Sequence, residues 1–298
     1  MALPSYASTV QKTYYYLYLF FCGVVFFFLV APLIAIVPIS FSVSPFMVFT
    51  DGMLAWPPDP DAWSLRWYKN MIGDCSADVV SSTVPCSNKW MIGTVNSFFI
   101  GLVSTAIATA LGTLAALGLS RPHMPFKGLI MAILISPMIV PLIITAAGMF
   151  FFYARISLVY TFTGVILAHV ALATPFVVIT VTATLIGFDM NMVKASQSLG
   201  AKPIRTFFKV IMPLILPGVI SGALFAFITS FDEVVIVMFM ASLDQLTIPK
   251  QMWAGIRQEI SPVILCMATC LVVLSIFLLT TVELLRRRAE KMRGITPH

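Results

Sequence analysis

Apolar residues fill six long stretches of this chain, and polar residues gather between them. A helix needs roughly 20 mainly apolar residues to cross the hydrocarbon core of a membrane, and each stretch is long enough. We therefore predict an all-α integral membrane protein with six transmembrane helices. The predicted spans cover residues 15–41, 91–119, 126–153, 157–185, 214–240 and 262–285.

Composition supports this prediction. Of the 298 residues, 59% are hydrophobic and only 10% are charged, which is too little charge to cover a soluble domain of this length. The net charge of +6 would suggest a nucleic-acid partner in a soluble protein. Here we expect membrane lipid and no nucleic acid, because Lys and Arg gather in the loops on one side of a membrane. The first apolar stretch is too long for a signal peptide, so we expect a retained helix.

The distribution of positive charge predicts an orientation. If the N-terminus is cytoplasmic, 12 of the 18 Lys and Arg residues fall at inner positions and six at outer positions. Inner loops carry the excess of positive charge in membrane proteins, so both termini are predicted to be cytoplasmic. The chain is then one transmembrane domain over residues 1–298, with an outer loop at 42–90 and a long inner loop at 187–213.

The cysteines allow one disulfide outside the membrane. Cys75 and Cys86 lie in the predicted outer loop, on a side that is oxidising in many bacteria. A bond between them would stiffen the loop, and whether it forms stays open. The three other cysteines lie in apolar runs, and no Cys/His cluster has the spacing of a metal site, so we expect no metal.

The inner loop has a helical pattern. Val193, Gln197 and Gly200 recur at helical spacing. Gly commonly ends a helix in a left-handed conformation, and Pro is tolerated in a helix's first turn. Gly200 followed by Pro203 therefore predicts a helix, a tight turn and a second helix at the inner membrane face. This object is either an ordinary amphipathic connection or a knob that docks into a soluble partner.

The same loop resembles the signature of permease subunits of bacterial binding-protein-dependent ABC importers, which reads EAA, three residues, then Gly. Lys194 replaces the signature Glu and reverses its charge, and Ser196 replaces the second Ala. Five further blocks, among them "SFDEVVIVMF" and "HVALATPFVVITVTATLIGFD", are similar to the polyamine branch of this family. The positions that match the signature are Ala195, Gly200, Ala201, Phe207 and Pro213.

The resemblance implies the ABC importer permease fold, with a cytoplasmic coupling helix that sits in a cleft of an ATPase subunit. The chain has no P-loop motif, so ATP and Mg are expected on that separate ATPase, with no cofactor and no catalysis on this chain. The implied partners are a second permease subunit, expected as a heterodimer, two ATPase subunits and an external binding protein. The implied location is the bacterial inner membrane. The residues expected to couple to the ATPase are Val193, Lys194, Ala195, Ser196, Leu199, Gly200 and Ala201.

Asp232 and Glu233 stand side by side in an otherwise apolar run. Counted from Leu214, they lie about 27 Å along a continuous helix. Three interpretations are open: the carboxylates reach the outer headgroups, one of them pairs with a neighbouring helix, or they line a path for a cation. On a continuous helix, Asp232 would share a face with Phe225, Ile228 and Ile236, and Glu233 would share one with Thr229 and Val237. His169, in the fourth span, is either a neutral residue hydrogen-bonded between helices or a further contact on the path.

The favoured function is the permease subunit of an ATP-driven importer that forms the path for a small organic cation, such as spermidine or putrescine. Aromatic side chains would complement the acids through cation–π contacts. One alternative is an ABC permease for an opine or an amino-acid derivative. Another is a secondary transporter coupled to cation movement, and a third is a membrane scaffold without a path of its own.

Overall fold

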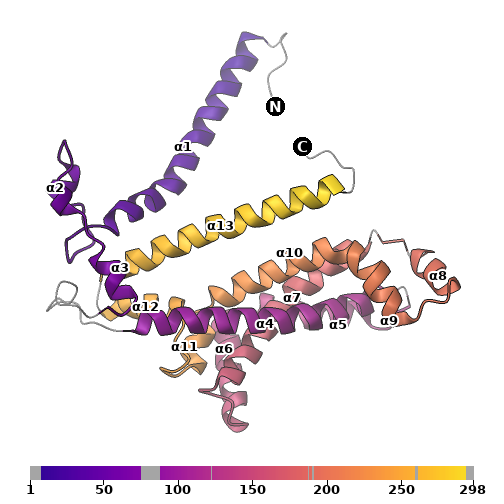
Figure 1. Cartoon of the computed structure of the whole chain (residues 1–298). Helices are drawn as coiled ribbons and strands as arrows, with labels where there is room; N and C mark the ends of the chain where they lie inside the picture. Colours follow the sequence, from indigo (N-terminus) through magenta and orange to yellow (C-terminus); the bar gives the residue numbers. More distant parts are fainter. Residues whose placement is uncertain are drawn as a thin grey trace. The chain divides into compact units, whose positions relative to one another are not determined.

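The computed structural model describes residues 8–74, 88–121, 123–186, 188–189, 191–258 and 261–292. Within these ranges the chain is helical, with no strand beyond an isolated bridge between Ser42 and Trp63 (Figure 1). The elements are α1 (Thr9–Ile39), α2 (Asp51–Leu54), the short 3-10 helix η1 (Pro60–Ala62), α3 (Arg66–Met71), α4 (Lys89–Leu119), α5 (Lys127–Ile139), α6 (Leu142–Arg155), α7 (Phe162–Ile186), α8 (Asn191–Ser198), α9 (Pro203–Thr206), the π-helical turn η2 (Phe207–Ile211), α10 (Met212–Phe231), α11 (Val235–Met240), α12 (Ile248–Gln258) and α13 (Val263–Met292).

Five of the described helices are long and apolar enough to cross a membrane: α1, α4, α7, the continuous segment Pro203–Phe231, and α13. Helices α5 and α6 make a sixth span if they are counted together, although they are bent by 103°. Pro141 explains the break, because a residue before proline avoids the helical region. Val140 is accordingly extended, with φ −71° and ψ 135°. The prediction of one span at 126–153 therefore corresponds to two helices.

The predicted span at 214–240 is also interrupted. Its helix begins earlier, at Pro203, and ends at Phe231, and a separate helix follows from Val235 to Met240. The prediction of one helix through these residues was wrong. Its apolar residues do not show the break, because a buried turn and a buried helix carry the same kind of side chains.

The chain divides into two compact units, one formed by residues 1–88 with 255–298 and the other by residues 89–254. We refer to them as the terminal unit and the central unit. The prediction of a single permease domain over the whole chain stays a prediction. In the terminal unit, α13 contacts both α1 and α3. The buried Trp67 of α3 donates from its indole nitrogen to the Ser42 carbonyl at 2.9 Å, which holds the start of the predicted outer loop.

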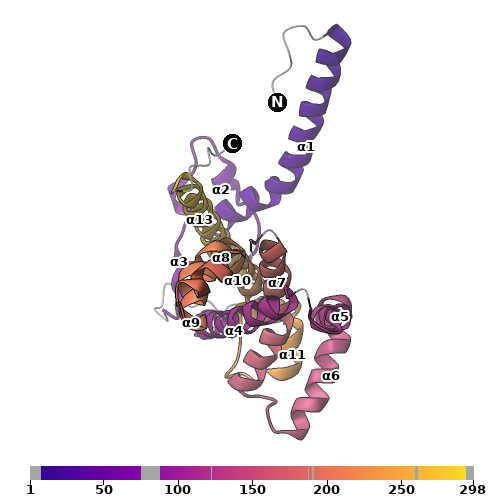
Figure 2. The same cartoon turned by 90° about the vertical axis from the view of Figure 1, so that its right-hand side faces the viewer.

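The core of the central unit is a bundle of α4, α7 and α10, with α7 the most buried of the three (Figures 1 and 2). Helices can approach this closely in a membrane only where small residues line the contact. A Cβ on Gly112 of α4 would lie 2.6 Å from Val177 Cβ, and one on Gly222 of α10 would lie 2.9 Å from Val177 Cα. The glycines therefore set the distance of both helices from α7.

Enlarging Gly222 should loosen this bundle. Gly222→Val places a branched side chain against the backbone of α7, and overpacking of this kind costs about 1–3 kcal/mol. Gly148→Val is the matched control, because Gly148 is also inside a helix but a Cβ added there would meet no atom within 4 Å. Thermal unfolding of the purified protein in detergent should show a clear loss of stability for the first variant only. Equal melting temperatures for the two variants would contradict the packing described here.

Candidate functional site

The two adjacent carboxylates lie in the break between α10 and α11. Helix α10 ends at Phe231, Asp232 follows as its C-terminal cap with φ −90° and ψ −1°, and α11 starts at Val235. The predicted helical faces for Asp232 and Glu233 were therefore wrong, because these residues are not on a continuous helix. The break gives the two carboxylates different surroundings.

Glu233 is turned into the protein and is only 7% exposed. One of its carboxylate oxygens accepts a hydrogen bond from the Ile236 backbone nitrogen at 2.9 Å. This nitrogen is in the first turn of α11, where no helical carbonyl is available to accept its hydrogen. The carboxylate thus acts as the N-terminal cap of a short helix whose Ile236, Val237 and Met240 side chains are all buried.

The half-buried cation Lys250 lies at the other end of α11. The Lys250 ammonium donates to the Ala241 carbonyl at 2.8 Å and to the Val237 carbonyl at 3.4 Å. Burial lowers the pKa of Lys250 from its ordinary value, because the charged form loses hydration. An acid at the start of a helix and a cation at its end both match the helix dipole. Sequence reasoning counted Lys250 only as an outer-loop charge, since nothing in its spacing from α11 indicates the contact.

Asp232 differs from Glu233 in being exposed. It directly follows Phe231, which belongs to a cluster of three phenylalanine rings. The centroid distances are 5.2 Å for Phe98–Phe231, 5.3 Å for Phe227–Phe231 and 6.5 Å for Phe98–Phe227. All three side chains are only half-buried. A Cβ on Gly101 would lie 3.2 Å from the Phe227 ring, so this glycine provides the space in which that ring sits.

His169 of α7 contacts the same end of α10 and is only 1% exposed. Its Nδ1 and the Ser230 hydroxyl are 2.8 Å apart, which ties α7 to α10 two residues before Asp232. Its Nε2 has no hydrogen-bond partner among the residues that the structure describes. The geometry matches the interpretation of a histidine hydrogen-bonded between helices, and its place on a substrate path stays a prediction.

The segment after α11 is fastened to α4. The Asn96 amide donates to the carbonyls of Asp244 and Leu246 at 2.8 and 2.9 Å. The neighbouring Ser97 hydroxyl accepts from the Ile248 nitrogen at 2.9 Å. Sequence reasoning missed these two anchors, since one polar pair in an apolar helix does not indicate its partner.

The inner loop has the predicted helix, turn and second helix. Helix α8 ends at Ser198, Gly200 adopts φ +77°, and Pro203 opens α9. Gly200 donates to the Gln197 carbonyl at 2.9 Å, and Ala201 donates to the Ser196 carbonyl at 3.1 Å. This pair of bonds is the Schellman motif, in which a left-handed residue closes a helix. The spacing of Gly and Pro predicted this turn correctly.

Ser196, which departs from the family signature, forms a second link across the turn. Its hydroxyl lies 2.8 Å from the hydroxyl of Thr206, a buried residue of α9. Helix α8 has no buried residue, and Leu199, which directly follows it, is 88% exposed. Lys194 is also exposed. The result is a short helix with a fixed position and an uncovered outer surface.

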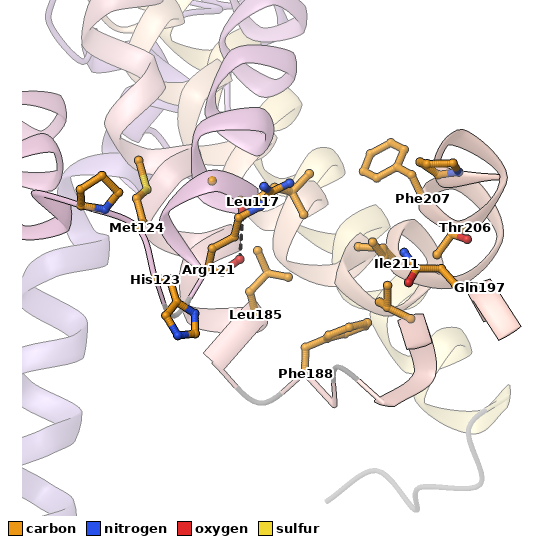
Figure 3. Close-up of a pocket in the computed structure, with 15 residues that line it drawn as sticks. Leu117, Arg121, His123, Met124, Leu185, Phe188, Gln197, Thr206, Phe207 and Ile211 are labelled. Atoms are coloured by element: carbon orange, nitrogen blue, oxygen red, sulfur yellow. Dashed lines mark hydrogen bonds between the residues drawn. The ribbon is translucent and has the colours of Figure 1, made fainter. Parts of the chain in front are cut away.

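A cavity of about 850 Å³ lies beside α8. Figure 3 shows His123 and Met124 on one side of it and Gln197, Thr206 and Phe207 on the other. These residues come from the link between α4 and α5 and from the inner loop. The cavity therefore separates one side of α8 from the end of α4.

Three of the five cysteines lie among the described residues. Cys75 and Cys86 lie outside the described residues, so their disulfide stays a prediction. Cys22, Cys266 and Cys270 are free thiols. Among the described residues, no group of three or more His, Cys, Asp or Glu side chains could hold a metal ion.

Comparison with solved structures identifies the fold. The crystal structure of a bacterial ABC transporter involved in the import of the acidic polysaccharide alginate matches 94% of this chain and 99% of its own chain, with a TM-score of 0.74. At 13% sequence identity this likeness concerns the fold alone. The fold is that of an ABC transporter permease, as predicted.

The sequence identifies the family. The model of the family described as binding-protein-dependent transport system inner membrane component matches residues 108–291, which is more than half of the chain. The chain belongs to this family, and it is a multi-pass permease subunit of a binding-protein-dependent ABC importer. A secondary transporter is therefore not favoured. A permease is a transport subunit, in agreement with the prediction of a chain that is not an enzyme.

The curated relatives share most of its length. A spermidine/putrescine transport system permease protein, PotC of Haemophilus influenzae, is 28% identical over 269 residues, which cover 90% of this chain and 95% of the relative. PotC of Escherichia coli strain K12 is 26% identical over 276 residues, covering 93% and 95%. The putrescine transport system permease protein PotI of the same strain is 28% identical over 252 residues, covering 82% and 81%. The resemblance to the polyamine branch is thus confirmed at the level of relatives.

The different positions of Asp232 and Glu233 predict different effects on stability. Glu233→Ala removes the cap of α11 and should cost about 0.5–2 kcal/mol, the usual effect of losing such a cap. Glu233→Gln keeps an oxygen that accepts the Ile236 hydrogen and should cost much less. Asp232→Ala should leave the melting temperature of the purified protein nearly unchanged. Equal losses for the two alanine variants would rule out the capping role.

Proposed function

We propose that this chain forms part of the path by which a di- or polyamine, such as putrescine or spermidine, crosses the bacterial inner membrane. The observation that carries the proposal is the exposed Asp232, which directly follows Phe231 of the cluster formed by the Phe98, Phe227 and Phe231 rings. A carboxylate and the faces of aromatic rings are the two kinds of group that attract an ammonium ion in proteins. The names of the relatives point to the same substrates.

In this proposal the two carboxylates have separate roles. Asp232 meets the ammonium group and offsets part of the hydration that it loses on leaving water. Glu233 supports the site by holding α11, and with it the break that exposes Asp232. His169 contributes through its bond to Ser230, which steadies the end of α10.

We further propose that the inner loop couples transport to ATP hydrolysis on separate ATPase subunits. Both termini would then be cytoplasmic, and α8 would sit in a cleft of an ATPase. The contact surface is the exposed side of α8 and the turn after it, and the Schellman turn and the Ser196–Thr206 bond hold its shape. The proposed coupling residues are Val193, Lys194, Ala195, Ser196, Leu199, Gly200 and Ala201.

The continuous helical segment Pro203–Phe231 would carry the movement. It has 29 residues and is thus roughly 43 Å long. One end is joined to α8 by the Ser196–Thr206 bond, and the other ends at Asp232. A shift of α8 driven by closure of the ATPases would therefore reach the substrate carboxylate through one element. The remaining proposed partners are a second permease subunit, in a heterodimer, and an external binding protein.

The substrate proposal is tested by transport with the complete importer in proteoliposomes. Asp232→Asn removes the charge that meets the ammonium and should lower ATP-dependent uptake of labelled spermidine about tenfold to a hundredfold, given the usual strength of charged hydrogen bonds. Phe227→Leu removes one ring and should reduce uptake by a smaller factor. Glu233→Gln, which keeps the cap, should leave uptake close to that of the unmodified chain.

Asp244→Asn is the matched control, because Asp244 is another exposed carboxylate after α11. The proposal is wrong if Asp232→Asn transports spermidine at the normal rate. If the unmodified importer moves no spermidine but moves an opine or another amino-acid derivative, the permease assignment stands and the polyamine substrate is excluded.

A further inference from the structure

Three cations stand on the first turns of the segment that leads into α10. Lys202 precedes α9, Arg205 lies in α9, and Lys209 lies in the π-helical turn. Their spacing of three and four residues places them on one side of the segment. All three are exposed, and none of their side chains has a hydrogen bond or an ion pair within the part of the chain that the structure describes.

The neighbouring acids do not neutralise them. The central unit has four acidic residues: Asp189, Asp232, Glu233 and Asp244. Asp189 is the only one of these in the inner loop, and its carboxylate accepts from the Asn191 nitrogen at 2.9 Å. The cations therefore form a positive patch without internal compensation.

A groove of about 780 Å³ runs beside this patch, between α8 and the start of α10. Arg205 and Lys209 line it together with apolar side chains of the membrane-spanning segment, among them Val210 and Leu214. The α8 wall is formed by residues that include five of the proposed coupling residues, so a bound lipid and a docked ATPase would share this wall. Helix α8 thus stands between two hollows, because Val193 and Gln197 line the cavity on its other side. The groove combines two cations with an apolar wall that continues into the membrane-spanning segment.

We propose that this groove binds an anionic phospholipid. The phosphate would lie between Arg205 and Lys209, and one acyl chain would follow Val210 and Leu214. Both parts of the groove find a complement in such a molecule, whereas a small anion leaves the apolar wall uncovered and a neutral lipid leaves the cations unpaired. Positive residues at a membrane surface attract anionic lipids in this way. A lipid in this position would brace α8 against α10.

The experiment uses the purified complete importer in nanodiscs made with phosphatidylcholine, to which phosphatidylglycerol with the same acyl chains is added. Native mass spectrometry counts the phosphatidylglycerol molecules retained by the complex. Arg205→Gln combined with Lys209→Gln should weaken the retained binding about 30-fold, given the usual contribution of each basic residue near an anionic surface. Lys127→Gln, which removes an exposed cation at the start of α5, should behave like the unmodified importer.

Three results would overturn the proposal. The first is equal retention of phosphatidylglycerol by the unmodified importer and the double variant. The second is full displacement of the lipid by inorganic phosphate, since the groove would then recognise phosphate alone. The third is loss of the ATPase subunits from the double variant with lipid retention unchanged, which would make the groove a protein contact. None of these readouts depends on which substrate the importer carries.

Discussion

A helix inside a membrane can be interrupted only where other groups take over the hydrogen bonds that the interruption releases. The end of α10 meets this requirement with charged side chains. Glu233 accepts the hydrogen of Ile236 at the start of α11, and Lys250 donates to the Ala241 carbonyl at its end. Because both ends of this six-residue helix are satisfied, α10 can stop at Phe231 and leave Asp232 exposed. The placement of the proposed substrate carboxylate depends on this arrangement.

The two ends of the segment Pro203–Phe231 are specified by different chemistry. At the end that begins with Pro203, Gly200 takes a left-handed conformation, and the bond between Ser196 and Thr206 fixes α8 to α9. At the other end, Phe231 packs against Phe98 of α4, and Ser230 is bonded to His169 of α7. The segment thus joins a proposed coupling surface to a proposed substrate site. That connection gives the importer a physical means to link the two.

Sequence predicted the features that depend on local rules. Apolar length indicated the spans, and the spacing of Gly200 and Pro203 indicated the turn in the inner loop. It failed where the outcome depends on distant partners. A continuous helix through Asp232 was the natural expectation, because Val234 to Met240 are as apolar as the helix before them. The break is stabilised by Lys250, and the segment after α11 is held by Asn96, which lies on α4. The sequence around Asp232 predicts neither contact, because both partners lie in other segments of the chain.

The separate roles of Asp232 and Glu233 are tested most directly by the reactivity of cysteines placed at these two positions. The chain would carry Asp232→Cys or Glu233→Cys, with its five native cysteines replaced by serine, in the complete importer. We expect a cationic thiol reagent to modify position 232 quickly and spermidine to slow this reaction. Position 233 should react slowly because it is buried. Equal reaction rates at the two positions, with no protection by spermidine, would contradict the separate roles of the two carboxylates.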